Sequence, residues 1–352
     1  MKYPRRIKGL HDVDTTRVSR DQIRFVDIYF SGACNLNCIY CFTNHDKGKL
    51  TTLDRKGLLT QAKALGAETF VATGAGEPLL DEGFREVISH ADKLGMTSAI
   101  YTNGHYITSE TAKFLYNHNV SPLVKLESLD PNIHDSITRK EGSQKKVIEA
   151  LENLRLAGYG QVSGGLTRLG VASVYTALNI EGFFDLKKYC DEKGILFMAD
   201  ELGLERKAHE NRKDLFVVKP IVDKVKAELG IVESGIGYPH SREEMTCNFA
   251  DYGIRIDQNG NVSYCTMQDL GNTVGNVLEK GLETVIYGVG IAKRIAIREK
   301  RKTINQVNEA LIRNKIPYEI GFPLGTCPFK AGDNLEVRSR DSLPILENEL
   351  RR

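Results

Sequence analysis

The stretch Cys34-Asn35-Leu36-Asn37-Cys38-Ile39-Tyr40-Cys41 places three cysteines in eight residues with the spacing C-x3-C-x2-C, directly after an apolar-rich run over residues 23–30. Cysteine thiolates are the usual ligands of iron–sulfur clusters, and a short loop can turn three of them toward one face of a [4Fe-4S] cluster. One iron of that cluster would then have no protein ligand, and its open position would be available to a small chelating molecule. The stretch therefore predicts a loop that binds a [4Fe-4S] cluster through Cys34, Cys38 and Cys41.

Two other interpretations of these cysteines have weaker support. A zinc site would need a fourth ligand, which His45 could supply, but zinc loops more often pair two C-x2-C knuckles. A disulfide framework fits less well, because the chain has seven cysteines, an odd number, and shows no secretory signal.

The composition limits the classes of partner. Lysine plus arginine (48) nearly balances aspartate plus glutamate (46), so the net charge of +2 favours neither a nucleic acid nor a membrane surface as a partner. Apolar runs are too short to span a bilayer, and no signal peptide is visible. We therefore predict a cytoplasmic protein, because free thiolates and oxygen-sensitive clusters persist in a reducing compartment.

The first two thirds of the chain alternate between strand and helix patterns. Six such units predict a parallel sheet with right-handed crossovers, either a partial barrel or an open doubly wound sheet. In both architectures a ligand site lies at the carboxyl ends of the strands, which is where the cysteine stretch follows its strand. The predicted strands cover residues 23–30, 69–73, 97–102, 123–127, 171–176 and 195–200.

The pattern changes after Asp200. A helix is predicted over residues 217–229, and a hairpin over 254–257 and 262–265, because Asn259-Gly260 favours a tight turn. We therefore predict two domains that follow an N-terminal segment. The predicted boundaries are 1–22 for this segment, 23–235 for the sheet domain and 236–352 for a small domain of a β-hairpin plus helix.

Two motifs together resemble the radical SAM superfamily. The first is C-x3-C-x2-C with an aromatic residue, Tyr40, before the last cysteine; the second is Gly74-Ala75-Gly76-Glu77-Pro78 after the second strand, which is similar to the family's GGEP motif with Ala75 in place of a glycine. The resemblance implies a partial (β/α)6 TIM-like barrel. It also implies that the open iron binds S-adenosylmethionine, whose reductive cleavage gives a 5′-deoxyadenosyl radical that removes a hydrogen atom from the substrate.

The resemblance also implies residues that contact the cofactor. Ala75, Gly76, Glu77 and Pro78 would contact the methionine amino group, and Asn103, Ser128 and Asn179, at or after the ends of later strands, would lie on the cofactor side. Tyr40 and Phe42 would stack on adenine, or else belong to the core. Taken alone, Gly76-Glu77-Pro78 would more often be a plain turn before a helix, and Asn and Ser are common turn residues for local hydrogen-bonding reasons.

A second group of cysteines lies in the C-terminal third. Cys247 and Cys265 have the spacing C-x12-G-x4-C, which is similar to the opening half of the SPASM and twitch extensions of radical SAM enzymes. This likeness implies an auxiliary [4Fe-4S] cluster bound by Cys247, Cys265 and Cys327. A hairpin would bring the first two thiols to one end of a ribbon. The alternative is that these are unpaired structural cysteines.

These patterns predict a radical SAM enzyme with one auxiliary cluster, supplied with electrons by a reductase such as flavodoxin or ferredoxin. We expect hydrogen abstraction from a small polar metabolite that leads to dehydrogenation or rearrangement; the alternative substrate is a ribosomally made peptide. A non-catalytic iron–sulfur electron carrier or redox sensor would leave Gly76-Glu77-Pro78 unexplained. Arg168, Asp200 and Glu201, near the ends of the fifth and sixth strands, are candidates to hold substrate or move a proton, unless they form surface ion pairs.

Overall fold

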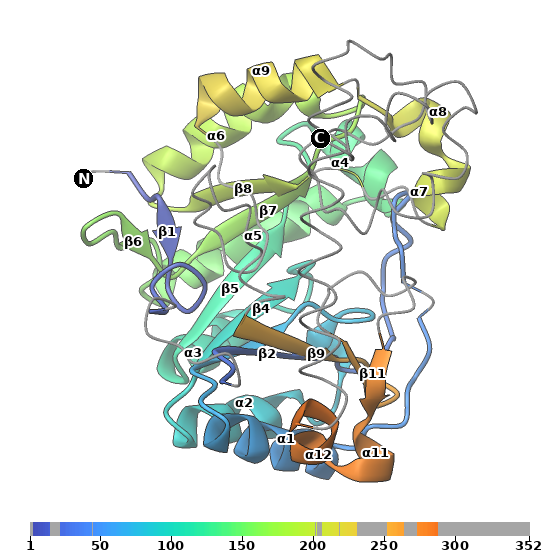
Figure 1. The fold of residues 1–352 in the computed structure, drawn as a ribbon. Helices are drawn as coiled ribbons and strands as arrows, with labels where there is room; N and C mark the ends of the chain where they lie inside the picture. Colours follow the sequence, from blue (N-terminus) through green and yellow to red (C-terminus); the bar gives the residue numbers. More distant parts are fainter. Residues whose placement is uncertain are drawn as a thin grey trace, which may run out of the picture.

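The centre of the molecule is one curved, mainly parallel β-sheet (Figure 1). The structure is a computed structural model that describes residues 3–14, 22–43, 45–200, 202, 206–217, 219–230, 252–263 and 273–287. Within these residues the main sheet has nine strands in the order β11-β10-β9-β2-β3-β4-β5-β7-β8. The strands are β1 (Arg6–Ile7), β2 (Phe25–Ile28), β3 (Thr69–Ala72), β4 (Thr97–Thr102), β5 (Val120–Lys125), β6 (Leu166–Thr167), β7 (Gly170–Val174), β8 (Leu196–Asp200), β9 (Gly253–Ile256), β10 (Asn261–Ser263) and β11 (Thr273–Asn276).

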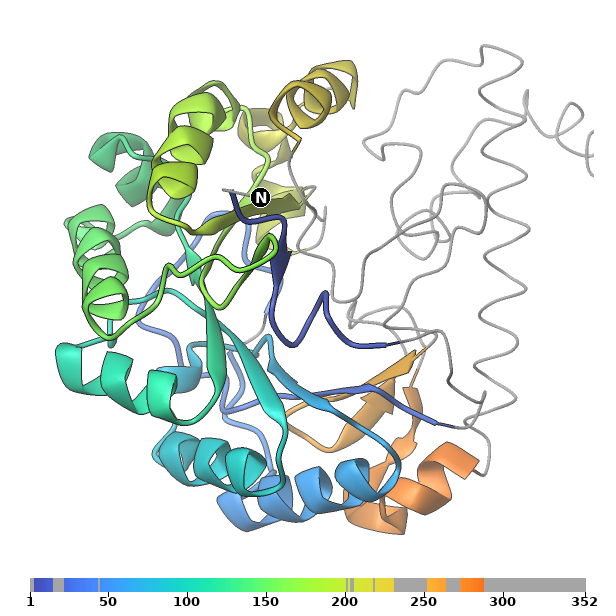
Figure 2. The same cartoon turned by 90° about the vertical axis from the view of Figure 1, so that its left-hand side faces the viewer.

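Helices connect the parallel strands and cover one side of the sheet. Figure 2 shows them in an arc along its outer side. Thr51 begins the first helix with a capping box, in which its hydroxyl and the Asp54 carboxylate each accept from the other residue's backbone N–H. The helices and 3-10 turns are α1 (Thr52–Ala64), η1 (Pro78–Leu80), α2 (Phe84–Lys93), α3 (Ser109–Asn117), α4 (Pro131–Thr138), α5 (Ser143–Leu156), η2 (Ile180–Gly182), α6 (Phe183–Glu192), α7 (Lys207–Glu210), α8 (Arg212–Leu215), α9 (Lys219–Leu229), α11 (Val277–Lys280) and α12 (Leu282–Val285).

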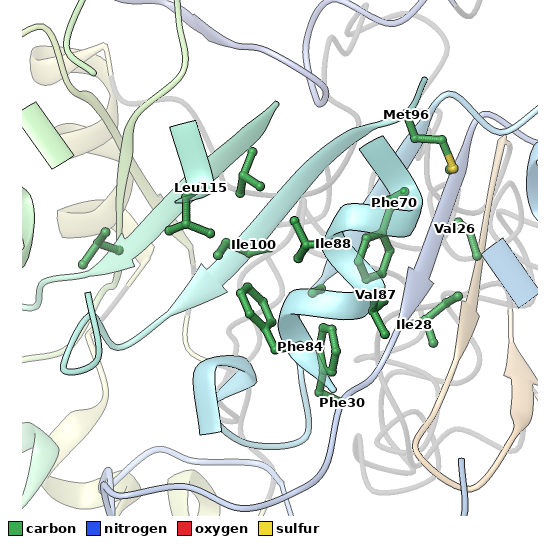
Figure 3. Close-up of a cluster of buried hydrophobic side chains, with 14 of the residues drawn as sticks. Val26, Ile28, Phe30, Phe70, Phe84, Val87, Ile88, Met96, Ile100 and Leu115 are labelled. Carbon is green, nitrogen blue, oxygen red and sulfur yellow. The ribbon is translucent and has the colours of Figure 1, made fainter. Parts of the chain in front are cut away.

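The two faces of the sheet have different cores, and this difference identifies a barrel-type fold. Alternate side chains such as Val26, Phe70 and Ile100 pack beneath the outer helices (Figure 3). The intervening side chains, including Phe25 and Val71, face inward and form a second apolar cluster without any of the connecting helices. The predicted partial (β/α)6 barrel is therefore confirmed, and in the part of the chain that the structure describes no connecting helix packs on the inner face, as it would in an open doubly wound sheet.

The N-terminal segment fills the inner face at one end of the barrel. Strand β1 pairs in parallel with β6, in the turn before β7. Ile7 and Leu10 then belong to the same apolar cluster as the barrel-strand residues Phe25, Leu123 and Leu196. The inner face is thus closed by apolar side chains at its N-terminal end.

The predicted hairpin exists and extends the barrel sheet. Strands β9 and β10 are antiparallel, with Gly260 (φ +84°) in the turn between them. Strand β9 also pairs in parallel with β2, in the register Phe25↔Gly253 to Ile28↔Ile256. The predicted boundary at residues 235 and 236 lies outside the described residues. Among the residues that are described, no helix combines the length and apolar character needed to cross a membrane.

Candidate functional site

The segment of residues 31–50, hereafter the cysteine loop, connects the carboxyl end of β2 to α1. Its middle is fixed by backbone hydrogen bonds to the end of α4, from Asn37 N to Thr138 O (3.2 Å) and from Ile39 N to Ile137 O (2.9 Å). Its returning part is fixed at the turn after β9, where the backbone N–H groups of Lys49 and Leu50 donate to the Gln258 carbonyl. The sequence motif is therefore held from both sides at the C-terminal end of the barrel.

Two thiols of this loop, those of Cys34 and Cys38, lie in an environment that disfavours thiolates. Burial, and then the negative charge of Glu77, raise the pKa of Cys34. Burial, the charge of Glu127 and the neighbouring thiols raise the pKa of Cys38 to about 12. A thiolate here needs a nearby cation, and the iron of a cluster would supply one.

Three thiols on one short loop are a donor set that suits a cluster. Among the described residues, no three Cys, His, Asp or Glu side chains are grouped as ligands of a single ion. A cube of four irons and four sulfides is wider than one ion and does not require its ligands to meet at a point. His45 instead lies with Nδ1 3.0 Å from the Gly32 carbonyl and Nε2 3.6 Å from Cys41 Sγ.

The segment Gly74–Pro78 packs directly on the cysteine loop. Glu77 N donates to Ala33 O (2.8 Å), and a Cβ on Gly76 would lie only 2.3 Å from that oxygen. The glycine is therefore required by close approach to the chain's own backbone. Ala75 is fully buried, and Pro78 begins η1.

The Glu77 carboxylate joins the ends of β3 and β4. It accepts hydrogen bonds from Thr102 Oγ1 (2.7 Å), Asn103 N (2.7 Å) and Leu79 N (3.1 Å). Burial raises the pKa of this carboxyl to about 7, against the opposing effect of these donors. Glu77 is thus a buried acid placed beside Cys34 and aligned by neighbouring strands.

Asn103 connects the end of β4 to the first cysteine. Its Nδ2 donates to Asn35 Oδ1 (2.8 Å) and lies 4.0 Å from Cys34 Sγ. Its Oδ1 accepts from the backbone N–H of His105 (3.0 Å). The sequence placed Asn103 on the cofactor side, and here its side chain contacts the cysteine loop.

Tyr40, at the other end of the motif, contacts two charged residues, Glu127 and Lys125, and the sequence predicted neither contact. Its hydroxyl donates to Glu127, which also lies 3.3 Å from Lys125 Nζ and accepts from Ser173 Oγ and Val174 N. Burial tends to raise the pKa of Glu127, but Lys125 and the donated hydrogen bonds outweigh it, so the pKa is lowered. A sequence signal for this pair was available. Lys125 and Glu127 stand at alternate positions at the end of a buried strand, so their side chains point to the same face.

Ser128 and Asn179 support the ends of β5 and β7. Asn179 Nδ2 donates to the carbonyls of Glu127 and Val174 (3.0 Å each), and its Oδ1 accepts from Thr176 N and Oγ1. Ser128 Oγ accepts from Asp130 N (3.0 Å). Both side chains therefore make hydrogen bonds within the protein that support the strand ends. Phe42 is half-buried in the cysteine loop.

Arg168 lies at the wrong end of the sheet for the predicted role. It precedes β7, so it sits at the N-terminal end, opposite the cysteine loop. Its Nη2 donates to the carbonyls of Tyr116 and Val120 (3.0 Å each), and its guanidinium lies 4.7 Å and 5.2 Å from the rings of Tyr116 and Tyr159. The prediction misjudged which end of the fifth strand this residue occupies.

Of the remaining predicted residues, the structure describes Asp200 alone. Asp200 is the last residue of β8 and therefore lies at the same end of the sheet as the cysteine loop. Cys190, the one other described cysteine, is fully buried in α6. Outside the described residues are Glu201, Cys247, Cys265 and Cys327.

Comparisons with known proteins match the part of the chain that carries this geometry. The family model of the Radical SAM superfamily matches residues 28–171, which include the cysteine loop, Glu77, Asn103 and Glu127. Mycofactocin maturase MftC from Mycobacterium tuberculosis is 30% identical over 148 residues, which are 40% of this chain and 37% of that protein. A probable GTP 3′,8-cyclase from Methanothermobacter thermautotrophicus is 26% identical over 186 residues, 51% of this chain and 58% of that protein.

A solved structure shares the fold. Streptococcus suis SuiB bound to S-adenosylmethionine superposes with a TM-score of 0.64 at 20% identity, covering 80% of this chain and 69% of SuiB. SuiB is also known bound to the precursor peptide SuiA. The chain spans less than two thirds of the length of either curated relative.

Proposed function

We propose that this chain, which carries a radical SAM domain over residues 28–171, uses Cys34, Cys38 and Cys41 to hold a [4Fe-4S] cluster that binds and reductively cleaves S-adenosylmethionine. When bound, these groups would supply a 5′-deoxyadenosyl radical that abstracts a hydrogen atom from a substrate. The chain's own residues would hold and orient these groups.

The single observation that carries this proposal is the pair of buried carboxylates beside the cysteine loop. Glu77 adds negative charge near Cys34, and Glu127 does so near Cys38. Because three thiols and two acids in a poorly solvated place favour cations, the site suits both iron and a ligand with sulfonium and ammonium charges. A simple electron carrier would have no need for Glu77, the buried acid that accepts hydrogen bonds from the end of β4.

Each neighbouring side chain has a definable task in this proposal. Glu77 is tied to three donors, so its carboxyl group is fixed in place and holds the backbone of residues 74–77 against the loop. Asn103 orients Asn35 and with it the first cysteine. Tyr40 is held in place by Glu127, which keeps the ring beside the last cysteine.

The substrate we propose is a ribosomally made peptide. The sequence favoured a small polar metabolite, but the comparisons support the peptide alternative better, because MftC is named a maturase and SuiB binds a precursor peptide. The residue candidate that remains for substrate contact is Asp200, at the cysteine-loop end of β8.

An auxiliary [4Fe-4S] cluster at Cys247, Cys265 and Cys327 remains part of the proposal. Replacing Cys34, Cys38 and Cys41 together by alanine should leave about half of the iron that the reconstituted chain binds, because a second cluster would be independent. Complete loss of iron in this triple variant would argue against a second cluster.

Electron paramagnetic resonance of the anaerobically reduced chain tests cofactor binding. We expect the signal of the reduced cluster to change its g values when S-adenosylmethionine is added, because the ligand occupies the open iron. The triple cysteine variant should lose the g-value response to S-adenosylmethionine. A cluster signal in the unsubstituted chain that is indifferent to S-adenosylmethionine would contradict the proposal.

A second experiment separates the two substrate classes. The reconstituted chain, with S-adenosylmethionine and a reductant, is given a low-molecular-mass extract of the source organism, either untreated or digested with a broad peptidase. Stimulation of 5′-deoxyadenosine formation that is lost after digestion supports a peptide substrate. Stimulation that survives digestion would restore the small-metabolite prediction.

A further inference from the structure

A chain of polar side chains joins the two ends of the cysteine motif through residues that no motif includes. His105 follows β4, Ser143 is the first residue of α5, and His134 lies in α4. His105 Nε2 lies 2.8 Å and His134 Nε2 3.1 Å from the same hydroxyl, Ser143 Oγ. Ser143 is fully buried and His134 nearly so, so water does not complete these contacts.

The backbone fixes the direction of every hydrogen bond at the His105 end. The backbone N–H of His105 must donate, so Asn103 presents its Oδ1 there and its Nδ2 to Asn35. Asn35 then accepts with Oδ1 and presents Nδ2 to His105 Nδ1, at 2.9 Å. His105 Nδ1 is therefore an acceptor, and the proton sits on Nε2, which donates to Ser143.

The same reasoning fixes the other end. The backbone N–H of Glu127 donates to His134 Nδ1 (3.2 Å), so His134 also carries its proton on Nε2 and donates to Ser143. Both imidazoles are neutral in this arrangement. Burial is the main cause that lowers the pKa of each, His105 to about 4, which agrees with the neutral forms.

The chain therefore runs between the two flanks of the cysteine motif. One end is Asn35, directly after Cys34; the other is Glu127, whose carboxylate holds Tyr40, directly before Cys41. We infer that His105, Ser143 and His134 are positioning residues that set the orientation of Cys34 relative to Cys41 by this continuous series of hydrogen bonds. Their role in cofactor chemistry rests on the proposed function, but the positioning itself does not.

Alkylation of the iron-free chain tests the inference without any cofactor. We measure the iodoacetamide reaction rate of Cys34 by mass spectrometry, with Cys190 in α6 as the buried internal reference. Ser143→Ala leaves two buried N–H groups without an acceptor, so Cys34 should react roughly tenfold faster while Cys190 is unchanged. The reconstituted variant should also show a shifted midpoint potential, because hydrogen bonds and solvent exposure around a cluster set that potential.

Thr167→Val is the matched control. It also removes a buried hydroxyl, whose Oγ1 donates to Gly194 O (3.0 Å), but at the opposite end of the sheet. We expect this variant to alkylate Cys34 at the rate of the unsubstituted chain. If Ser143→Ala and Thr167→Val give the same Cys34 rate and the same midpoint potential, the inference is overturned.

Two variants of half-buried His105 keep the test decisive if Ser143→Ala does not fold. His105→Leu removes both contacts and should speed alkylation of Cys34 as Ser143→Ala does. His105→Asn retains an acceptor near the position of Nδ1 for Asn35 and should bring the rate back toward the unsubstituted value. Equal rates in these two variants would overturn the inference. A fast Cys34 in Ser143→Ala together with no cleavage of S-adenosylmethionine in the unsubstituted chain would support positioning and refute the proposed function.

Discussion

Replacement of Gly76 by alanine should separate the segment Gly74–Pro78 from the cysteine loop. The new Cβ would lie 2.3 Å from Ala33 O and 2.5 Å from Gly32 O, whereas ordinary contact begins at 3.4 Å. Both neighbours are backbone atoms, so no side-chain rotation relieves the overlap, and the two segments must move apart by about 1 Å. The hydrogen bond from Glu77 N to Ala33 O, now 2.8 Å, does not survive this movement.

The expected cost follows from these two changes. A lost hydrogen bond costs about 1 kcal/mol and overpacking costs about 1–3 kcal/mol. The free energy of unfolding of the iron-free chain should therefore fall by about 2–4 kcal/mol, measured by urea titration as a lower midpoint at unchanged slope. Reconstituted Gly76→Ala should also bind less iron per chain, since Cys34 lies next to Ala33.

Gly57→Ala is the matched control. Gly57 is exposed within α1, and a Cβ there meets nothing within 4 Å. This change should raise the free energy of unfolding by about 0.5–1 kcal/mol and leave iron binding unaltered. If Gly76→Ala matches the unsubstituted chain in urea midpoint and iron content, the close contact between the two segments is not a feature of the protein in solution.

Three further outcomes follow from the structure. Burial raises the pKa of Glu77 from 4.5 to about 7, so between these pH values the folded chain retains a proton that the unfolded chain has released. The free energy of unfolding should therefore fall by about 3 kcal/mol as the pH rises through this window. Urea titrations should show no such fall in Glu77→Gln. Lys125→Met leaves the fully buried Glu127 without the cation that lies 3.3 Å from it, so the free energy of unfolding, measured with urea, should fall by about 1–3 kcal/mol. An unchanged free energy of unfolding would mean that the ion pair is solvated. Arg168→Ala removes two hydrogen bonds and two ring contacts and should lower the free energy of unfolding by about 2 kcal/mol. Formation of 5′-deoxyadenosine, compared at equal concentration of folded protein, should be unchanged. A selective loss of this activity would restore the predicted site role of Arg168.

The regular part of the fold was predictable because its signals are local. The strands at Thr69–Ala72 and Thr97–Thr102 alternate with amphipathic helices, and the cysteine spacing and Gly76-Glu77-Pro78 are contiguous motifs. Helix α4 was missed although its signal is also local. Asp130 caps it and Pro131 occupies its first turn, which is a common helix start.

The features that could not be predicted depend on contacts between distant segments. Tyr40 and Glu127 meet because the cysteine loop crosses the ends of strands that are not adjacent, and nothing in either local sequence names the other. The parallel pairing of β9 with β2 joins residues more than 200 positions apart. Arg168 is a different case, because it precedes the fifth strand both in the predicted range 171–176 and in the observed β7, so its end of the sheet could have been inferred from the sequence.

The most direct test of the central claim is the formation of 5′-deoxyadenosine. The chain is reconstituted anaerobically with iron and sulfide, reduced with dithionite and incubated with S-adenosylmethionine, and products are measured by liquid chromatography with mass spectrometry. We predict 5′-deoxyadenosine and methionine from the unsubstituted chain and neither from the variant that lacks Cys34, Cys38 and Cys41. No 5′-deoxyadenosine from a chain whose cluster is intact by its absorption and paramagnetic spectra would contradict the account.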